Sequence, residues 1–320
     1  MKNVCVGVWG DGTIKHWNIG GAFVRCNLMS RLINIYKSYD NPPIEISVFD
    51  GIYNSAWTAG RQTMYLGMSD DNYLWWLDWY KDQKVGFNFV CSNTQSDVNE
   101  ECGNKFLRAA HSSLNGIILT SDELRKHLRK KYPDYKLIYS LTDHPKEMTV
   151  DFYNQKLDEY DIVVLPTELN YNYDFINALS DSSRIEILVN ESCYKNCQYR
   201  DVCRKVVEDK DTPLCFLHLP SLYKKSKEEL LRVPTDAISS EHIKILESLG
   251  INHFKLSGRT ELEMRFFYDL NHYVLEDLNI PVTVWDQEAK GLLGGDPIPQ
   301  EKILEAQERY STHRLSSYRE

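Results

Sequence analysis

The stretch NGIILTSDELRKHLRKKYPDYKLIYSLT, residues 115–142, is typical of a strand, a helix and a second strand in succession. Its two apolar runs are short, rich in β-branched or aromatic residues and bounded by turn residues, which predicts buried strands. Between them, Ser121 followed by Glu123 and Leu124 predicts the N-cap of an amphipathic helix.

The same alternation continues in both directions from this stretch. The eight apolar runs are residues 44–51, 85–91, 115–120, 136–142, 161–166, 184–190, 230–234 and 253–258. The helical segment before the last run ends at Gly250, a natural helix C-cap. Strand and helix alternating eight times in 320 residues predicts an α/β fold, a (β/α)8 TIM-like barrel. An open doubly wound sheet is the alternative, because periodicity does not show closure.

The two ends of the chain fit this pattern poorly. We therefore expect one barrel domain over residues 1–280, in which the part before about residue 43 is an N-terminal extension. Residues 281–320 are expected to form a C-terminal cap or tail. The composition, 42% hydrophobic and 26% charged, is that of an ordinary globular protein.

Charge and hydropathy indicate the compartment and exclude some partners. The chain begins without a long apolar segment and contains no run of about 20 apolar residues, which predicts a soluble cytoplasmic protein without a membrane partner. A net charge of −9 does not indicate nucleic-acid binding by the whole molecule. The basic run HLRKKYPDYK, residues 127–136, is either a local RNA-binding patch or the solvated end of a surface helix.

Four of the eight cysteines lie in one window, NESCYKNCQYRDVCRKVVEDKDTPLC, residues 190–215. Cys193, Cys197, Cys203 and Cys215 follow the sixth apolar run, at the end of a strand where barrel active sites lie. Cytosolic thiols stay reduced, so clustered cysteines more often bind metal than form disulfides. Their spacing of three, five and eleven residues lacks C-x-x-C pairs, which leaves an iron–sulfur cluster, a zinc site and no metal as alternatives.

A fifth thiol complicates the choice of ligands. Cys91 ends the second apolar run, and a barrel would bring the end of that run to the same mouth. It could therefore replace Cys203 or Cys215 as a ligand. The other cysteines are interpreted as small apolar residues.

Charged residues after other strands complete the predicted site. Lys255 and Arg259 lie at the last run and could bind a carboxylate or phosphate of the substrate, or else form internal ion pairs. Glu168 and Glu191 follow the fifth and sixth runs. They are candidates for acid–base catalysis or for balancing the charge of a cation or metal.

Several of these segments resemble the collagenase-like peptidase family U-32, which includes ubiquinone-pathway and RNA-hydroxylating proteins. The similar segments are DIVVLPTEL (161–169), RIEILVNESC (184–193) and SEHIKILESLGINHFKLSGRT (240–260). An uncharacterised bacterial branch with a V-N-E-x-C motif is closer still, through VNESCYKNCQYR (189–200) and GFNFVCSN (86–93). The resemblance covers about residues 44–273.

The resemblance implies a TIM-like barrel whose clustered cysteines bind a [4Fe–4S] cluster. It also implies oxygen-independent hydroxylation with prephenate as the oxygen source. The chain departs from the family's H-G-A-L-C segment, where it has Asn190, Glu191 and Ser192, and from the cysteine spacing of the hydroxylases.

We therefore expect an iron–sulfur redox enzyme that hydroxylates a small anionic molecule or an RNA base. The alternative is an accessory barrel that serves a partner subunit and holds a structural zinc ion or cluster. A peptidase is the third possibility, for which the sequence offers no nucleophile and base.

Overall fold

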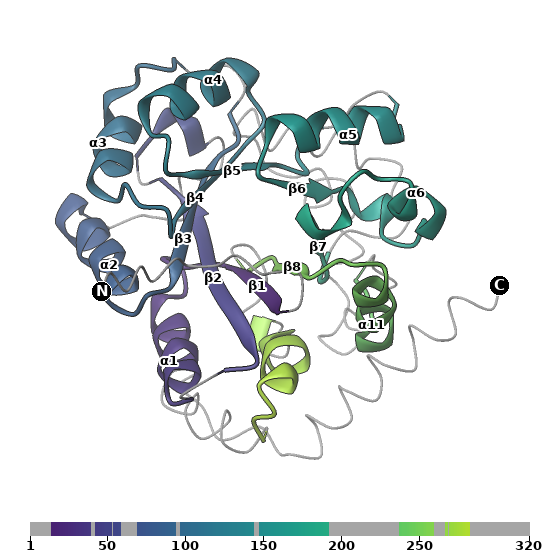
Figure 1. The fold of residues 1–320 in the computed structure, drawn as a ribbon. Helices are drawn as coiled ribbons and strands as arrows, with labels where there is room; N and C mark the ends of the chain where they lie inside the picture. The colour runs from purple at the N-terminus through teal and green to yellow at the C-terminus, as the bar shows by residue number, and fades with distance from the viewer. Residues whose placement is uncertain are drawn as a thin grey trace, which may run out of the picture.

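The chain folds into a closed barrel of eight parallel strands, seen along its axis in Figure 1. The computed structural model describes residues 14–39, 42–52, 54–58, 69–93, 97–143, 147–191, 237–258, 266–267 and 269–281. The strands are β1 (Lys15–Gly20), β2 (Ile44–Gly51), β3 (Gly86–Cys91), β4 (Gly116–Leu119), β5 (Lys136–Tyr139), β6 (Ile162–Leu165), β7 (Ile185–Leu188) and β8 (His253–Leu256). They pair in chain order, and β8 closes on β1 with His253 opposite His16. The predicted (β/α)8 class is confirmed.

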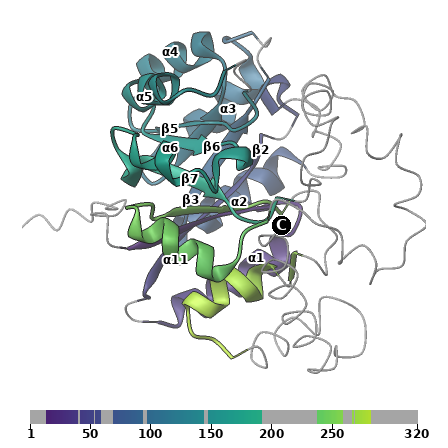
Figure 2. The same cartoon turned by 90° about the vertical axis from the view of Figure 1, so that its right-hand side faces the viewer.

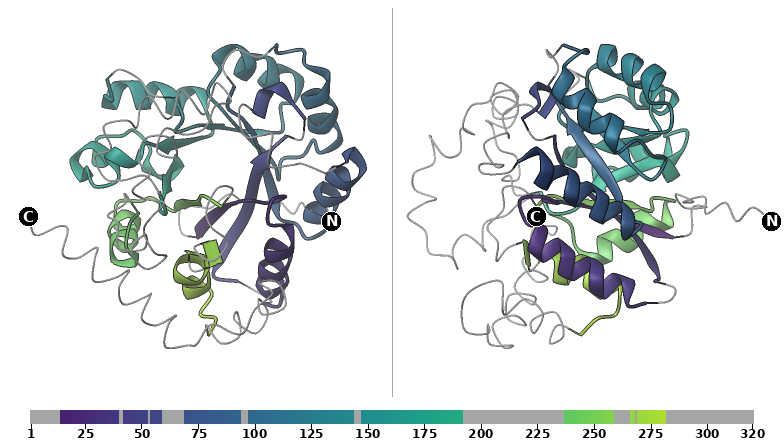
Figure 3. Two further views of the ribbon diagram at one scale, coloured as in Figure 1. Left: turned by 180° about the vertical axis from the view of Figure 1, so that it is seen from behind. Right: turned by 90° about the vertical axis from the view of Figure 1, so that its left-hand side faces the viewer.

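Helices surround the strands on the outside of the barrel, as Figure 1 and the view from behind in Figure 3 show. They are α1 (Cys26–Lys37), α2 (Asp70–Asp82), α3 (Glu101–Ala109), α4 (Asp122–Lys131), α5 (Val150–Glu159), α6 (Tyr173–Asn177) and α11 (Ser240–Ser248). A π-helix, Leu270–Leu275, follows β8. In the side view of Figure 2, α11 and this last helix pack on the same side of the barrel as α1.

Local signals set the ends of these helices as the sequence predicts. Ser121 caps α4, because its Oγ accepts a hydrogen bond of 3.2 Å from the Leu124 N–H. Gly250 follows α11 with a φ of +88°, and its N–H donates to the Glu247 carbonyl at 2.9 Å. A left-handed residue directly after a helix favours glycine, so Gly250 ends α11 in the expected way.

Residues 15–37 belong to the barrel, which corrects the extent of the predicted N-terminal extension. β1 pairs with both β2 and β8, and α1 is the first helix of the outer ring. The Phe23 N–H donates to Asp50 Oδ2 at 2.9 Å, which ties the loop after β1 to β2. The sequence KHWNIG hides this strand, because Asn18 faces a polar lumen and breaks the apolar run. Residues 1–13 and 282–320 lie outside the described residues, so the rest of the extension and the C-terminal cap stay predictions.

The seventh predicted strand is not needed to close the barrel. Residues 230–234 lie outside the described residues, and β7 pairs directly with β8, with Leu188 opposite Lys255. The closed barrel has eight strands without residues 230–234, because β1, which was not predicted, is one of them.

Alternation along each strand divides the side chains into two layers. Side chains that face out form the large core between sheet and helices, including Phe87, Phe89 and Cys91 of β3. A smaller apolar cluster fills part of the lumen, formed by Phe49, Val90, Ile118, Ile138, Ile162 and Val164. Because these residues come from five strands, β2 to β6, the apolar lining covers one side of the lumen. The other side, from β7, β8 and β1, is left to polar side chains.

Candidate active site at the carboxyl end of the barrel

A hydrogen-bonded set of polar side chains occupies the lumen. Asn18 of β1 donates from Nδ2 to Glu186 Oε2 of β7 at 3.0 Å, and Asn88 of β3 donates to Asn18 Oδ1 at 3.1 Å. Ser47 of β2 also contacts Asn18 Oδ1, at 3.3 Å. β1 is neighbour to neither β3 nor β7 in the sheet, so these bonds cross the lumen. All four residues are buried, and buried polar groups in such a network hold one another in place.

Lys255 joins this network from β8. Its Nζ lies 3.5 Å from Glu186 Oε1 and 4.3 Å from the centre of the Phe49 ring. Burial raises the pKa of Glu186, and Lys255 and Asn18 offset part of that effect. The internal ion pair expected as one alternative for Lys255 is therefore present, and the ammonium group faces the lumen rather than the helices.

The end of β7 is fastened to the segment after β8 by one asparagine. Asn190 Nδ2 donates to the Ser257 carbonyl at 2.8 Å, and the Ser257 N–H donates to Asn190 Oδ1 at 2.7 Å. Asn190 Nδ2 also contacts Asp269 Oδ2 at 2.7 Å. Asn190 is fully buried, so the amide holds the start of the cysteine window against the carboxyl end of β8.

Val189 and Ile238, which lie shortly before and after residues 192–236, are also held together at this end. The Ile238 N–H donates to the Val189 carbonyl at 2.8 Å. The Tyr273 hydroxyl donates to the Ile238 carbonyl at 2.6 Å and lies 3.4 Å from the Val189 carbonyl. The chain therefore leaves the barrel after β7 and returns to the same point, at the face where (β/α)8 enzymes carry their active sites.

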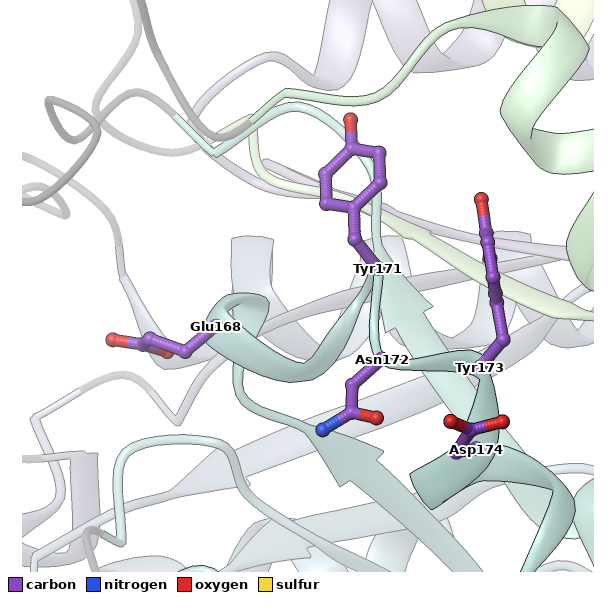
Figure 4. Close-up of a pocket in the computed structure, with 5 residues that line it drawn as sticks. All are labelled: Glu168, Tyr171, Asn172, Tyr173 and Asp174. Atoms are coloured by element: carbon purple, nitrogen blue, oxygen red, sulfur yellow. The ribbon is translucent and has the colours of Figure 1, made fainter. Parts of the chain in front are cut away.

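Glu168 and Glu191 both follow strands at this face, but they differ in setting. Glu168 is exposed on a single turn of 3-10 helix, Thr167–Leu169, directly after β6. It lines an open cavity with residues 171–174, which lead into and begin α6, shown in Figure 4. Glu191 is half-buried and comes directly after the anchored Asn190.

The predicted ligands of a metal or cluster lie outside the described residues. These are Cys193, Cys197, Cys203 and Cys215, and the same holds for Arg259. In the part of the chain that the structure describes, no group of three or more His, Cys, Asp or Glu side chains is arranged to hold a metal ion.

Cys91 is not positioned to serve as a ligand at the mouth. It is fully buried in the outer core with Phe87 and Phe89, whereas its neighbour Val90 faces the lumen. Burial raises the pKa of its thiol, which disfavours the thiolate that metals require. The alternative in which Cys91 replaces Cys203 or Cys215 as a ligand is therefore wrong, because the Cys91 side chain points out of the lumen.

The basic run at residues 127–136 is largely engaged in internal contacts. Arg129 Nη2 lies 2.8 Å from Asp161 Oδ2, and Lys131 Nζ donates to Asn104 Oδ1 at 2.7 Å. The Lys136 ammonium is buried below the lumen network, and burial lowers its pKa to about 7. Arg129 and Lys131 therefore have partners within the chain, and the RNA-binding interpretation of this run stays a prediction.

Glu186, Asn18 and Asn88 are the site residues that reasoning from the sequence missed. A signal for Glu186 was available, because a charged residue inside the apolar run RIEILV is unusual unless it is paired. No comparable signal marks the two asparagines, since their partners come from strands distant in the sequence.

No protein-family model matches the chain, and no curated protein is similar to it. A solved structure of a U32 peptidase is similar, with a TM-score of 0.45 and 13% identity over 78% of this chain and 94% of that chain. Among the described helices, none is both long and apolar enough to cross a membrane.

Proposed function

We propose that this chain is an iron–sulfur redox enzyme of the U-32-like type that hydroxylates a small anionic molecule or an RNA base without oxygen. The observation that supports this most is the anchoring of the cysteine segment. Val189 and Ile238, which flank it, are bonded to each other at the carboxyl end of β7. The segment therefore begins and ends at the active-site face of a (β/α)8 barrel.

Cys193, Cys197, Cys203 and Cys215 would hold the cluster. Four thiols fit this group, because cysteine thiolates are the ligands of [4Fe–4S] clusters and no other sulfur donor is needed. When bound, such a cluster supplies one-electron redox chemistry.

The lumen network gives a candidate binding role to Lys255. Its ammonium group lies beside the Glu186 carboxylate and over the Phe49 ring and is almost fully buried, so its position in the lumen is fixed. A fixed buried charge attracts a carboxylate or phosphate more strongly than a solvated one. With Arg259 it would bind the anionic part of a prephenate-like co-substrate. Glu168 and Glu191 remain the candidates for proton transfer.

The test is metal analysis of protein purified without oxygen. We expect a brown protein that contains iron and acid-labile sulfide, and Cys197→Ala should lose most of both. Cys102→Ala is the matched control, because Cys102 is a half-buried thiol on α3, outside the window. It should keep its iron.

A colourless protein that contains one zinc ion would contradict this proposal. That result would support the accessory barrel with a structural metal site, a reading that the internal ion pair of Lys255 and Glu186 also suits. In that case Cys197→Ala should lose zinc and thermal stability together, since structural zinc contributes to folding.

A further inference from the structure

Three neighbouring strands of the barrel are each followed by a hydroxyl side chain at the active-site face. Ser92, Thr120 and Ser140 come directly after β3, β4 and β5, which lie side by side in Figure 1. The Ser140 N–H donates to the Leu119 carbonyl at 3.0 Å, so the pairing of β4 with β5 continues as far as Thr120 and Ser140. Neighbouring strands are about 5 Å apart, so these three residues form a row across the sheet, here called the hydroxyl row.

The hydroxyl row faces the lumen. Each of its members comes two positions after a residue of the apolar lumen cluster, namely Val90, Ile118 and Ile138. Leu119, which lies between Ile118 and Thr120, packs in the outer core instead. Alternate residues of a strand share a face, so the hydroxyl row lies directly above the apolar lumen cluster, at the carboxyl end of the barrel.

The Thr120 hydroxyl is the observation that points to a ligand. Thr120 is only 9% exposed, and its Oγ1 is covered and has no hydrogen-bond partner among the described residues. A buried hydroxyl without a partner costs free energy, so a folded protein that keeps one needs a reason to do so. A ligand at the mouth of the barrel that bonds to Thr120 supplies that reason.

The neighbours of Thr120 in the row indicate the chemistry of this ligand. Ser140 Oγ lies 3.0 Å from Thr142 Oγ1 and accepts from the Thr142 N–H at 3.3 Å, so its position is held by the turn after β5. Ser92 is half-buried. Serine and threonine hydroxyls both donate and accept hydrogen bonds, and so do the hydroxyl groups of a sugar.

This side of the lumen has no positive charge close to the row. Among the described residues that directly follow the three strands, 92–93, 120–121 and 140–143, there is no Lys or Arg. In the proposed function, Lys255 binds the anionic part of the substrate from β8, which is four strands from β4 in either direction around the barrel. The hydroxyl row therefore faces a different and uncharged part of the substrate.

We propose that the hydroxyl row binds neighbouring hydroxyl groups of a sugar, with Thr120 at its centre. This inference deepens the proposed function, and it rests on that function only in taking the carboxyl end of the barrel as the place of the reaction. It assigns to the substrate a sugar ring, either that of a free sugar or the ribose of a nucleoside. The hydroxyl row belongs to the barrel and not to the cysteine window, so it does not require a bound cluster.

The test compares methyl ribofuranoside with methyl deoxyribofuranoside, which lacks one of the two neighbouring hydroxyls, by ligand-observed NMR titration of the full chain. We expect the dissociation constant of the ribofuranoside to be at least about threefold smaller. Uridine added as a third ligand distinguishes a nucleoside from a free sugar as the source of the ring. Equal binding of the two furanosides, or no binding of either, would overturn the proposal.

Thr120→Val keeps the shape of the side chain and removes its hydroxyl. We expect this variant to bind the ribofuranoside about three- to tenfold more weakly. The melting temperature of the free protein should stay the same or rise by about 1–3 °C, because an unpartnered buried hydroxyl is replaced by a methyl group. A hydroxyl with a purely structural role would instead lower the melting temperature when it is removed.

Thr58→Val is the matched control, because the buried Thr58 hydroxyl donates to the Ile52 carbonyl and accepts from the Ile52 N–H, both at 2.8 Å. It should lower the melting temperature and leave sugar binding unchanged. Ser92→Ala, at a half-buried position, should weaken binding about threefold and keeps the test decisive if Thr120→Val does not fold. The proposal is overturned if Thr120→Val loses as much thermal stability as Thr58→Val, or if Thr120→Val and Ser92→Ala both bind at full strength.

The iron and sulfide content separates this proposal from the proposed function. Thr120→Val should contain as much of both as the unchanged protein, because the cysteine window is intact. A protein without iron that still prefers the ribofuranoside would contradict the redox function alone. A protein with a full cluster that does not distinguish the two furanosides would contradict the sugar site alone.

Discussion

His16 and His253 form a buried pair in the lumen, toward the amino ends of β1 and β8. Their Nδ1 atoms are 3.3 Å apart, and both residues are buried. Burial lowers the pKa of His253 to about 4, with Lys136 as a further cause. The pKa of His16 is also well below its usual value, through burial, His253 and Lys136. The acids that act on Lys136 are Glu45 and Asp161. The barrel therefore needs both imidazoles neutral.

This pair predicts a loss of stability in acid. Between pH 6.5 and about 4 the unfolded chain binds a proton at His253 that the folded chain does not bind, so stability falls as pH falls. From His253 alone the free energy of unfolding should decrease by about 3 kcal/mol between pH 7.5 and 4. Urea unfolding at several pH values measures this slope, and His253→Asn should flatten it.

The change of the free energy of unfolding with pH can still be compared if His253→Asn lowers stability at every pH, because a constant loss does not alter the slope. Asn154→Ala, at a side chain that does not titrate, is the control and should keep the wild-type slope. An unchanged slope in His253→Asn would show that other groups cause the acid sensitivity.

At the scale of elements, single side chains fasten strands to the segments that follow them. Asn190 links the end of β7 to Ser257 after β8 and to Asp269 before the π-helix. Asp50 similarly links β2 to the loop that follows β1. Strands in the barrel are only four to eight residues long, so each forms few backbone hydrogen bonds with its neighbours. The side-chain hydrogen bonds of Asn190 and Asp50 add to these.

Asn190→Ala should therefore be costly. The substitution removes three hydrogen bonds at a fully buried position, those to the Ser257 carbonyl, the Ser257 N–H and the Asp269 carboxylate. We therefore expect the free energy of unfolding to fall by about 2–4 kcal/mol. Urea unfolding measures the loss. Asn154→Ala removes one exposed bond, to the Ser180 N–H, and should cost under about 1 kcal/mol. Equal losses in the two variants would refute the anchoring role.

At the scale of the whole molecule, closure depends on β1. This strand pairs with β2 on one edge and with β8 on the other, which joins the first and last strands of the barrel. A barrel without β1 would have two open edges and an exposed lumen network.

Ile19→Pro should abolish cooperative folding, because proline removes a ladder donor in a strand paired on both edges. Leu231→Pro lies in the run at residues 230–234, which the closed barrel does not use, and should leave a cooperative barrel. Circular dichroism melts and limited proteolysis of the two proteins measure the difference. Cooperative melting of Ile19→Pro with a near-normal midpoint would mean that closure through β1 is dispensable.

Local signals explain which parts of the structure the sequence could predict. Seven strands were found because their apolar runs are short and bounded by turn residues, as in IILT and IVVLP. Helix ends at Ser121 and Gly250 were found because capping depends on residues a few positions apart. β1 was not predicted, because the side chains that it turns into the lumen are polar. Its place in the barrel depends on partners in β2, β7 and β8.

The sequence by itself determined the alternation of strands and helices and the place of the cysteine window after β7, whereas closure of the sheet into a barrel is seen only in the tertiary structure. The tertiary structure decided which side chains meet. It turned Cys91 outward into the core, paired Lys255 with Glu186, and joined Val189 to Ile238 across the window. The physical reason is that strand and helix patterns arise from neighbours in the chain, whereas these contacts join residues about 50 or more positions apart, or depend on which face of a strand is turned to the lumen.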